Sequence, residues 1–88
     1  MGEDERRKKA IHSFFKAYRE LQKCESVRLR AKTKLGGETL IEITKYCGCD
    51  KGIQILRIHQ DNEAIAYEQA TRQLERLAVE TKANRKAG

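Results

Sequence analysis

Residues 27–35, VRLRAKTKL, and residues 39–47, TLIEITKYC, decide the fold of this 88-residue chain. The first segment alternates non-basic and basic residues, and the second is rich in the β-branched and aromatic residues typical of strands. Gly36 and Gly37 lie between them and tolerate the positive φ angles of a tight reversal. The sequence therefore predicts an antiparallel hairpin with strands at 27–35 and 39–47.

The two faces of this hairpin suggest its register. Successive side chains of a strand point to opposite faces. A three-residue loop, Gly36–Glu38, pairs Leu35 with Thr39 and Ala31 with Ile43, which makes one face largely apolar. A two-residue loop would mix the faces, so we favour the three-residue loop. The opposite face then carries Arg28, Arg30, Lys32, Lys34, Leu40 and Tyr46.

An amphipathic helix is predicted on each side of the strands. The first runs over residues 4–24, and the second over residues 63–82 with Asp61 or Asn62 as its cap. The apolar stripe of the first helix is Ile11, Phe14, Phe15, Tyr18 and Leu21. The stripe of the second is Ala66, Tyr67, Ala70, Leu74, Leu77 and Ala78.

A third strand is predicted at residues 53–59, IQILRIH, after a second reversal at 48–52. Its alternation is irregular, because Ile53 and Ile55 share one face while Leu56 and Ile58 share the other. Two explanations stay open. A bulge near Gly48 or Leu56 shifts the phase, or both faces of the strand are covered, which would imply dimerisation through the sheet.

The element order is thus α-β-β-β-α, a single α+β domain over residues 1–88 with frayed ends at 1–3 and 83–88. Two helices pack on one face of a three-stranded antiparallel meander, and the opposite face is open. An all-α alternative reads residues 39–47 and 51–60 as a DNA-binding helix-turn-helix. Gly52 weakens that alternative, since glycine inside a helix costs about 1 kcal/mol relative to alanine.

Charge is distributed unevenly along the chain. Residues 1–34 hold eleven Lys and Arg against five Asp and Glu, whereas residues 35–88 hold eight of each. A one-sided basic surface is typical of proteins with anionic partners, although it also serves solubility. We expect nucleic acid, RNA rather than DNA, to bind the open face, with Tyr46 as a platform for a base. The expected phosphate contacts are Arg28, Arg30, Lys32 and Lys34.

A second hypothesis is a protein interaction module, such as an inhibitor or assembly factor. It would dock through the sheet face or a strand edge, and its contacts on the open face would be Leu40, Tyr46, Leu56 and Ile58. Affinity for a protein partner through these residues would change little with salt.

Catalytic and metal chemistry are not indicated. Cys47 and Cys49 lack the two-to-four-residue spacer usual in zinc sites, and no nucleophile, base and acid are grouped in the sequence. We expect neither enzymatic activity nor a cofactor. The three cysteines cannot all pair, and no apolar run resembles a signal peptide or membrane span. These features favour a cytoplasmic, reducing location without a membrane partner.

The chain resembles the two small proteins of the Alu domain of the signal recognition particle. The likeness covers about residues 11–82 and rests on the element order, residues 21–24 (LQKC) before the first strand, the glycine turn and the basic tail. Those proteins share an α-β-β-β-α fold, form a heterodimer and bind RNA on a concave sheet surface. The resemblance implies RNA binding on the open face and a homo- or heterodimer. It matches the four strand cations by location only.

Overall fold

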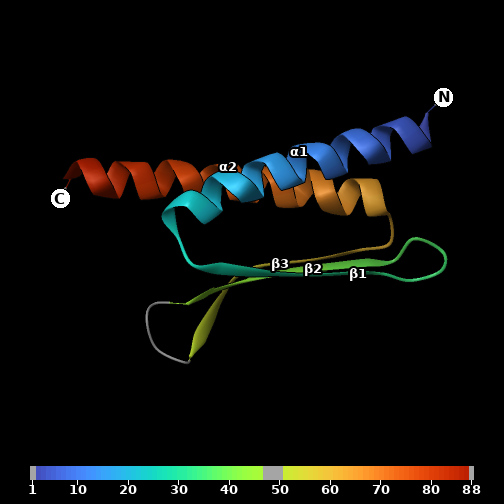
Figure 1. Ribbon diagram of the computed structural model, residues 1–88. Helices are drawn as coiled ribbons and strands as arrows, with labels where there is room; N and C mark the ends of the chain where they lie inside the picture. Colours follow the sequence, from blue (N-terminus) through green and yellow to red (C-terminus); the bar gives the residue numbers. More distant parts are fainter. Residues whose placement is uncertain (1, 47–50, 88) are drawn as a thin grey trace.

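Over the residues that it describes, the computed structural model contains five elements arranged in two layers (Figure 1). The elements are α1 (Glu3–Cys24), β1 (Val27–Thr33), β2 (Thr39–Tyr46), β3 (Gly52–Gln60) and α2 (Glu63–Ala87). Residues 2–46 and 51–87 are described, with side chains except at residues 3, 78 and 80–87. The predicted α+β fold is confirmed, and the middle of the chain forms strands rather than a helix-turn-helix.

The sheet is antiparallel with strand order β1-β2-β3, as expected for a meander. Both helices lie on the same side of it and run in the same direction, which leaves the opposite side uncovered (Figure 1). Asn62 caps α2, since its Oδ1 accepts a hydrogen bond from the Ile65 amide at 3.1 Å. α2 extends to Ala87, beyond its predicted end at Lys82, because nothing in the sequence of residues 83–87 breaks a helix.

The core lies between the helices and β2. Phe14 of α1 and Ile41 and Ile43 of β2 are completely buried. The Phe14 ring contacts Tyr67 of α2 edge to face, with ring centroids 5.2 Å apart. Most of both predicted stripes is buried, but Phe15 is 37% exposed and its placement in the stripe was wrong. One residue corresponds to about 100° of helix rotation, which carries Phe15 to the edge of the core.

The predicted register of β1 and β2 was wrong by two residues. Thr33 pairs with Thr39 and Leu29 with Ile43, so the loop spans the five residues 34–38. The loop is closed by hydrogen bonds from the Lys34 amide to the Glu38 carbonyl at 2.8 Å and from the Gly37 amide to the Lys34 carbonyl at 3.0 Å. A shift of two residues preserves both faces of a strand, so the predicted division into apolar and basic faces survives.

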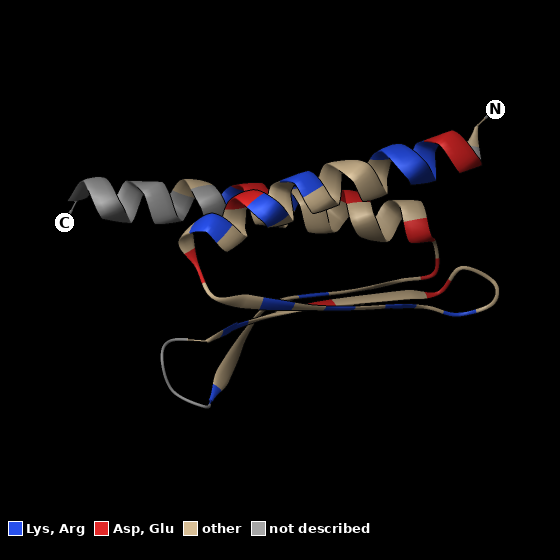
Figure 2. Cartoon of the chain, viewed as in Figure 1, with Lys and Arg blue, Asp and Glu red and all other residues tan. Residues whose placement is uncertain are grey.

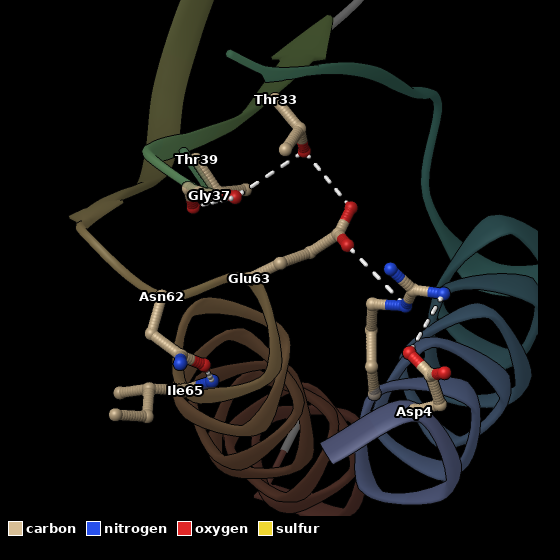
Figure 3. A network of polar contacts seen from close by, with 8 residues as sticks. Asp4, Thr33, Gly37, Thr39, Asn62, Glu63 and Ile65 are labelled. Atoms are coloured by element: carbon tan, nitrogen blue, oxygen red, sulfur yellow. Dashed lines mark hydrogen bonds and ion pairs between the residues drawn. The ribbon is translucent and has the colours of Figure 1, made fainter. Parts of the chain in front are cut away.

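A polar network ties the β1–β2 loop to both helices (Figure 3). The buried Thr39 donates its hydroxyl to the Gly37 carbonyl at 2.9 Å. Thr33 of β1 donates to Glu63 of α2 at 3.0 Å, and the other oxygen of that carboxylate lies 3.6 Å from Nε of Arg7 in α1. The network fixes this end of the sheet against the start of each helix.

A β-bulge explains the irregular pattern of β3. Ile43 pairs with Leu56 while Thr44 pairs with Gln54, so Ile55 has no partner on β2. The bulge shifts the alternation and turns Leu56 and Ile58 into the core, where they are 2% and 5% exposed. We expected both residues on the open face, and that placement was wrong. Beyond the bulge, the β2–β3 hairpin bends away from the helices (Figure 1).

The burial of Phe14 gives a prediction about stability. Phe14→Ala removes a ring from the centre of the core and should lower the free energy of unfolding by about 3–5 kcal/mol. Phe15→Ala deletes the same atoms from a partly exposed position and should cost much less. Urea denaturation of both variants measures the difference. Equal losses in the two variants would contradict this description of the core.

Candidate nucleic-acid interface

The uncovered side of the sheet, called here the open face, is predominantly basic. Its side chains alternate along each strand with those that face the helices. They are Arg28, Arg30 and Lys32 of β1, Leu40, Glu42, Thr44 and Tyr46 of β2, and Gln54, Arg57 and His59 of β3. Figure 2 shows basic segments along the strands of this layer. Arg57 had not been singled out, because the pairing of β3 was ambiguous before the bulge was located.

Three cations of the open face are available for an external anion. Arg30, Lys32 and Arg57 form no ion pair with any other residue in ranges 2–46 and 51–87. All three side chains are exposed. Elsewhere some cations are neutralised within the molecule, as Arg6 is by Glu68 at 2.9 Å, whereas Lys16 and Arg19 on α1 also form no ion pair with the described residues. The open face thus carries three cations without an internal counter-charge on a surface that no helix covers.

Lys34 differs from the other predicted cations. It lies in the β1–β2 loop, outside the strand in which we placed it, and its ammonium group is 3.5 Å from Glu38. The position is still next to the open face. A shallow pocket of about 250 Å³ is lined by Lys32, Lys34, Glu38, Leu40, Arg57 and His59. Leu40 contributes the apolar part of this pocket.

The structure brings Tyr46 and Arg28 together, although in the observed register Arg28 pairs with Thr44. The Arg28 guanidinium lies over the Tyr46 ring, 5.8 Å from its centroid, in a cation–π arrangement. On the β3 side the ring lies against Gly52, where an added Cβ would be 2.8 Å from Tyr46 Cε1 and would also clash with Thr44 Cγ2. Gly52 is a site residue that sequence reasoning missed. The signal was a glycine at a strand position, which often marks a close approach.

One carboxylate interrupts the basic surface. Glu42 sits at the centre of the open face, paired in register with Arg30 on β1 and Arg57 on β3. Its Oε2 accepts a hydrogen bond from Gln54 Nε2 at 2.6 Å. Glu42 forms no ion pair with either arginine among the described residues. Along β2, Glu42 lies between Leu40 at the pocket and Tyr46 with its Arg28 partner.

A second carboxylate, Glu38, is neutralised within the molecule. His59 Nε2 lies 2.8 Å from its Oε2, and this hydrogen bond, with Lys34 nearby, lowers the pKa of the Glu38 carboxyl. Glu38 therefore stays ionised at neutral pH at the rim of the pocket.

The other sequence candidates lie away from this face. Leu56 and Ile58 belong to the core, and Cys24 is exposed at the end of α1. Cys47 and Cys49 lie outside the described residues. Within the described part of the chain, no group of three or more His, Cys, Asp or Glu is placed to hold a metal ion. Neither helix, over its described residues, has an apolar stretch long enough to cross a membrane.

Comparison with known proteins adds no identification. No protein-family model, curated protein or solved structure matches the chain.

The packing of Tyr46 against Gly52 leads to a prediction. Gly52→Ala places a methyl group against Thr44 Cγ2 and the Tyr46 ring, and it should lower the free energy of unfolding by about 1–3 kcal/mol. The Tyr46 ring resonances should also move in an NMR spectrum. In a Thr44→Ser background the nearest atom is gone, so the same change at Gly52 should cost less. A neutral Gly52→Ala substitution would refute this packing.

The hydrogen bond between His59 and Glu38 leads to a prediction about the pKa of Glu38. Removing the main cause of the lowered pKa, with His59→Ala, should move the Glu38 titration midpoint upward, and Lys34 should still hold it below its usual range. The side-chain ¹³C shift of Glu38 followed against pH in both proteins measures this. Identical midpoints would mean that the two side chains do not interact in solution.

Proposed function

We propose that this chain is a small, non-enzymatic module that binds single-stranded nucleic acid, RNA rather than DNA, on the open face. The observation that carries the proposal is the set of cations Arg30, Lys32 and Arg57, which form no ion pair with the described residues, on a surface that the helices leave uncovered. Such cations contribute more free energy to phosphate binding than cations already paired within the molecule, because binding releases counterions without breaking an internal ion pair.

The geometry favours a single strand over a duplex. The major groove of B-DNA admits a helix or a two-stranded ribbon, whereas the open face is three strands wide. Alternate residues of β1 are about 6.6 Å apart, so Arg28, Arg30 and Lys32 form a row that an extended backbone can follow. Tyr46 with Arg28 offers a surface on which an unpaired base can stack. Thr44 and Gln54 provide hydrogen-bonding groups for a ribose 2′-hydroxyl.

The resemblance to the Alu-domain proteins supports the same proposal. Those proteins bind RNA on the sheet surface of an α-β-β-β-α fold, which is the element order found here. It also supports a homo- or heterodimer. In the described chain β1 and β3 each pair with β2 alone, so each leaves one strand edge for a partner.

The alternative of a protein interaction module has less support. It relied on Leu40, Tyr46, Leu56 and Ile58 on the open face, and Leu56 and Ile58 are instead buried in the core. Leu40 and Tyr46 remain there, with Lys32 and Arg57 in the pocket beside Leu40 and the Arg28 guanidinium over the Tyr46 ring. The charge of the surface therefore favours a polyanion over an apolar protein surface.

Charge reversal on the open face tests the proposal. Arg30→Glu with Lys32→Glu should weaken binding of a fluorescent uridine-rich RNA decamer by 100-fold or more, roughly the effect of removing two charge-assisted hydrogen bonds. The slope of log K against log salt should become shallower by about 1.4, because each phosphate neutralised on a single strand contributes about 0.7 to that slope. Fluorescence anisotropy over a salt series gives both quantities.

A matched control separates local effects from net charge. Lys16→Glu with Arg19→Glu makes the same charge change at exposed positions of α1 and should leave most of the affinity. Equal reductions in affinity for the two double variants would show that only the total charge matters. No binding by the wild-type chain at low salt would refute the proposed function.

A further inference from the structure

Glu42 is unusual for a surface that binds phosphates. Among the described strand side chains of the open face it is the acidic one, and there it repels a polyanion. A role in neutralising Arg30 and Arg57 does not explain why an acidic residue stands here. Neither arginine forms an ion pair with Glu42 within the described chain. Its Oε2 is held by the neutral amide of Gln54, and its Oε1 accepts no hydrogen bond from the described residues. The carboxylate is thus oriented, with Oε1 open and a second lone pair of Oε2 still able to accept a hydrogen bond.

Glu42 also lies between two places suited to a base. On one side along β2 is Leu40, the apolar part of the 250 Å³ pocket, whose cationic walls include Lys32 and Arg57. On the other side, past Thr44, is the Tyr46 ring with its Arg28 partner. Residues two apart on a strand share a face at a separation of about 6.6 Å. A base seated over Leu40 therefore has its edge within reach of the Glu42 carboxylate.

A carboxylate discriminates among bases by the donors on their Watson–Crick edges. It only accepts hydrogen bonds. Guanine presents N1–H and an N2–H side by side, which match the two oxygens of a carboxylate. Uracil presents one N3–H between two carbonyl oxygens, and those oxygens repel a carboxylate. Cytosine and adenine each offer one amino group beside an acceptor nitrogen.

We propose that Glu42, oriented by Gln54, reads guanine in a single-stranded RNA bound to the open face. This inference rests on the proposed function and adds base selectivity to it. The cations bind the RNA backbone whatever its sequence. Glu42 lowers that general affinity and adds a preference for guanine. The repulsion of phosphates is the expected consequence of placing an acceptor in a basic surface.

The experiment compares three RNA decamers on the wild-type chain by fluorescence anisotropy at one salt concentration. They are a guanosine-uridine repeat, the same repeat with inosine in place of guanosine, and oligouridine. Wild type should bind the guanosine repeat on the order of tenfold more tightly than oligouridine. The inosine repeat should fall between them, because inosine keeps N1–H and lacks the 2-amino group.

Glu42→Gln and Glu20→Gln form a matched pair of variants. Glu42→Gln should bind oligouridine more tightly than wild type and should lose most of the preference for the guanosine repeat. Glu20→Gln makes the same change at an exposed position of α1, away from the open face. It should change the affinity for all three RNAs by a similar small factor and leave their ratios unchanged.

The outcomes separate this inference from the proposed function. Equal affinity of the wild-type chain for all three RNAs, with strong salt dependence, would overturn the role of Glu42 and leave nucleic-acid binding intact. A guanine preference that survives Glu42→Gln would do the same. Absence of binding to every decamer would overturn both proposals.

Discussion

The structure depends on the one-sided burial of β2. Its residues Thr39, Ile41 and Ile43 are completely buried against the helices. Since successive side chains of a strand alternate, this burial forces Leu40, Glu42 and the following alternate residues to the other side of the sheet. The same residues that stabilise the domain therefore define its open face. A single layer of helices leaves that face uncovered (Figure 1).

The bulge at Ile55 allows β3 to contribute side chains both to the core and to the open face. It lets Leu56 and Ile58 complete the core near the middle of β3, while Gln54 on the far side of the bulge returns to the open face beside Glu42. Gly52, further along, lets the Tyr46 ring lie against the β3 backbone. Bulges often reposition side chains near functional surfaces. The proposed binding residues thus depend on backbone features that contribute no charge themselves.

The sequence was most informative where periodicity is strict. The alternation in β1 and the helical spacing around Phe14 predicted the element order, most of both helix stripes and the face carrying Arg28, Arg30 and Lys32. Quantities set by local hydrogen bonds were harder to predict. The length of the loop at Lys34 depends on its turn geometry, and a two-residue shift leaves the alternation unchanged. Gly52 and Glu42 become meaningful only through neighbours on other strands, which no single stretch of sequence reveals.

The most direct test of RNA binding on the open face is NMR chemical-shift mapping on the isotope-labelled chain during titration with the guanosine-uridine decamer at low salt. We expect progressive shifts at Arg30, Tyr46 and Arg57, with little change at Lys16 and Arg19 on α1. Shifts confined to the helices, or an unchanged spectrum at saturating RNA, would contradict it.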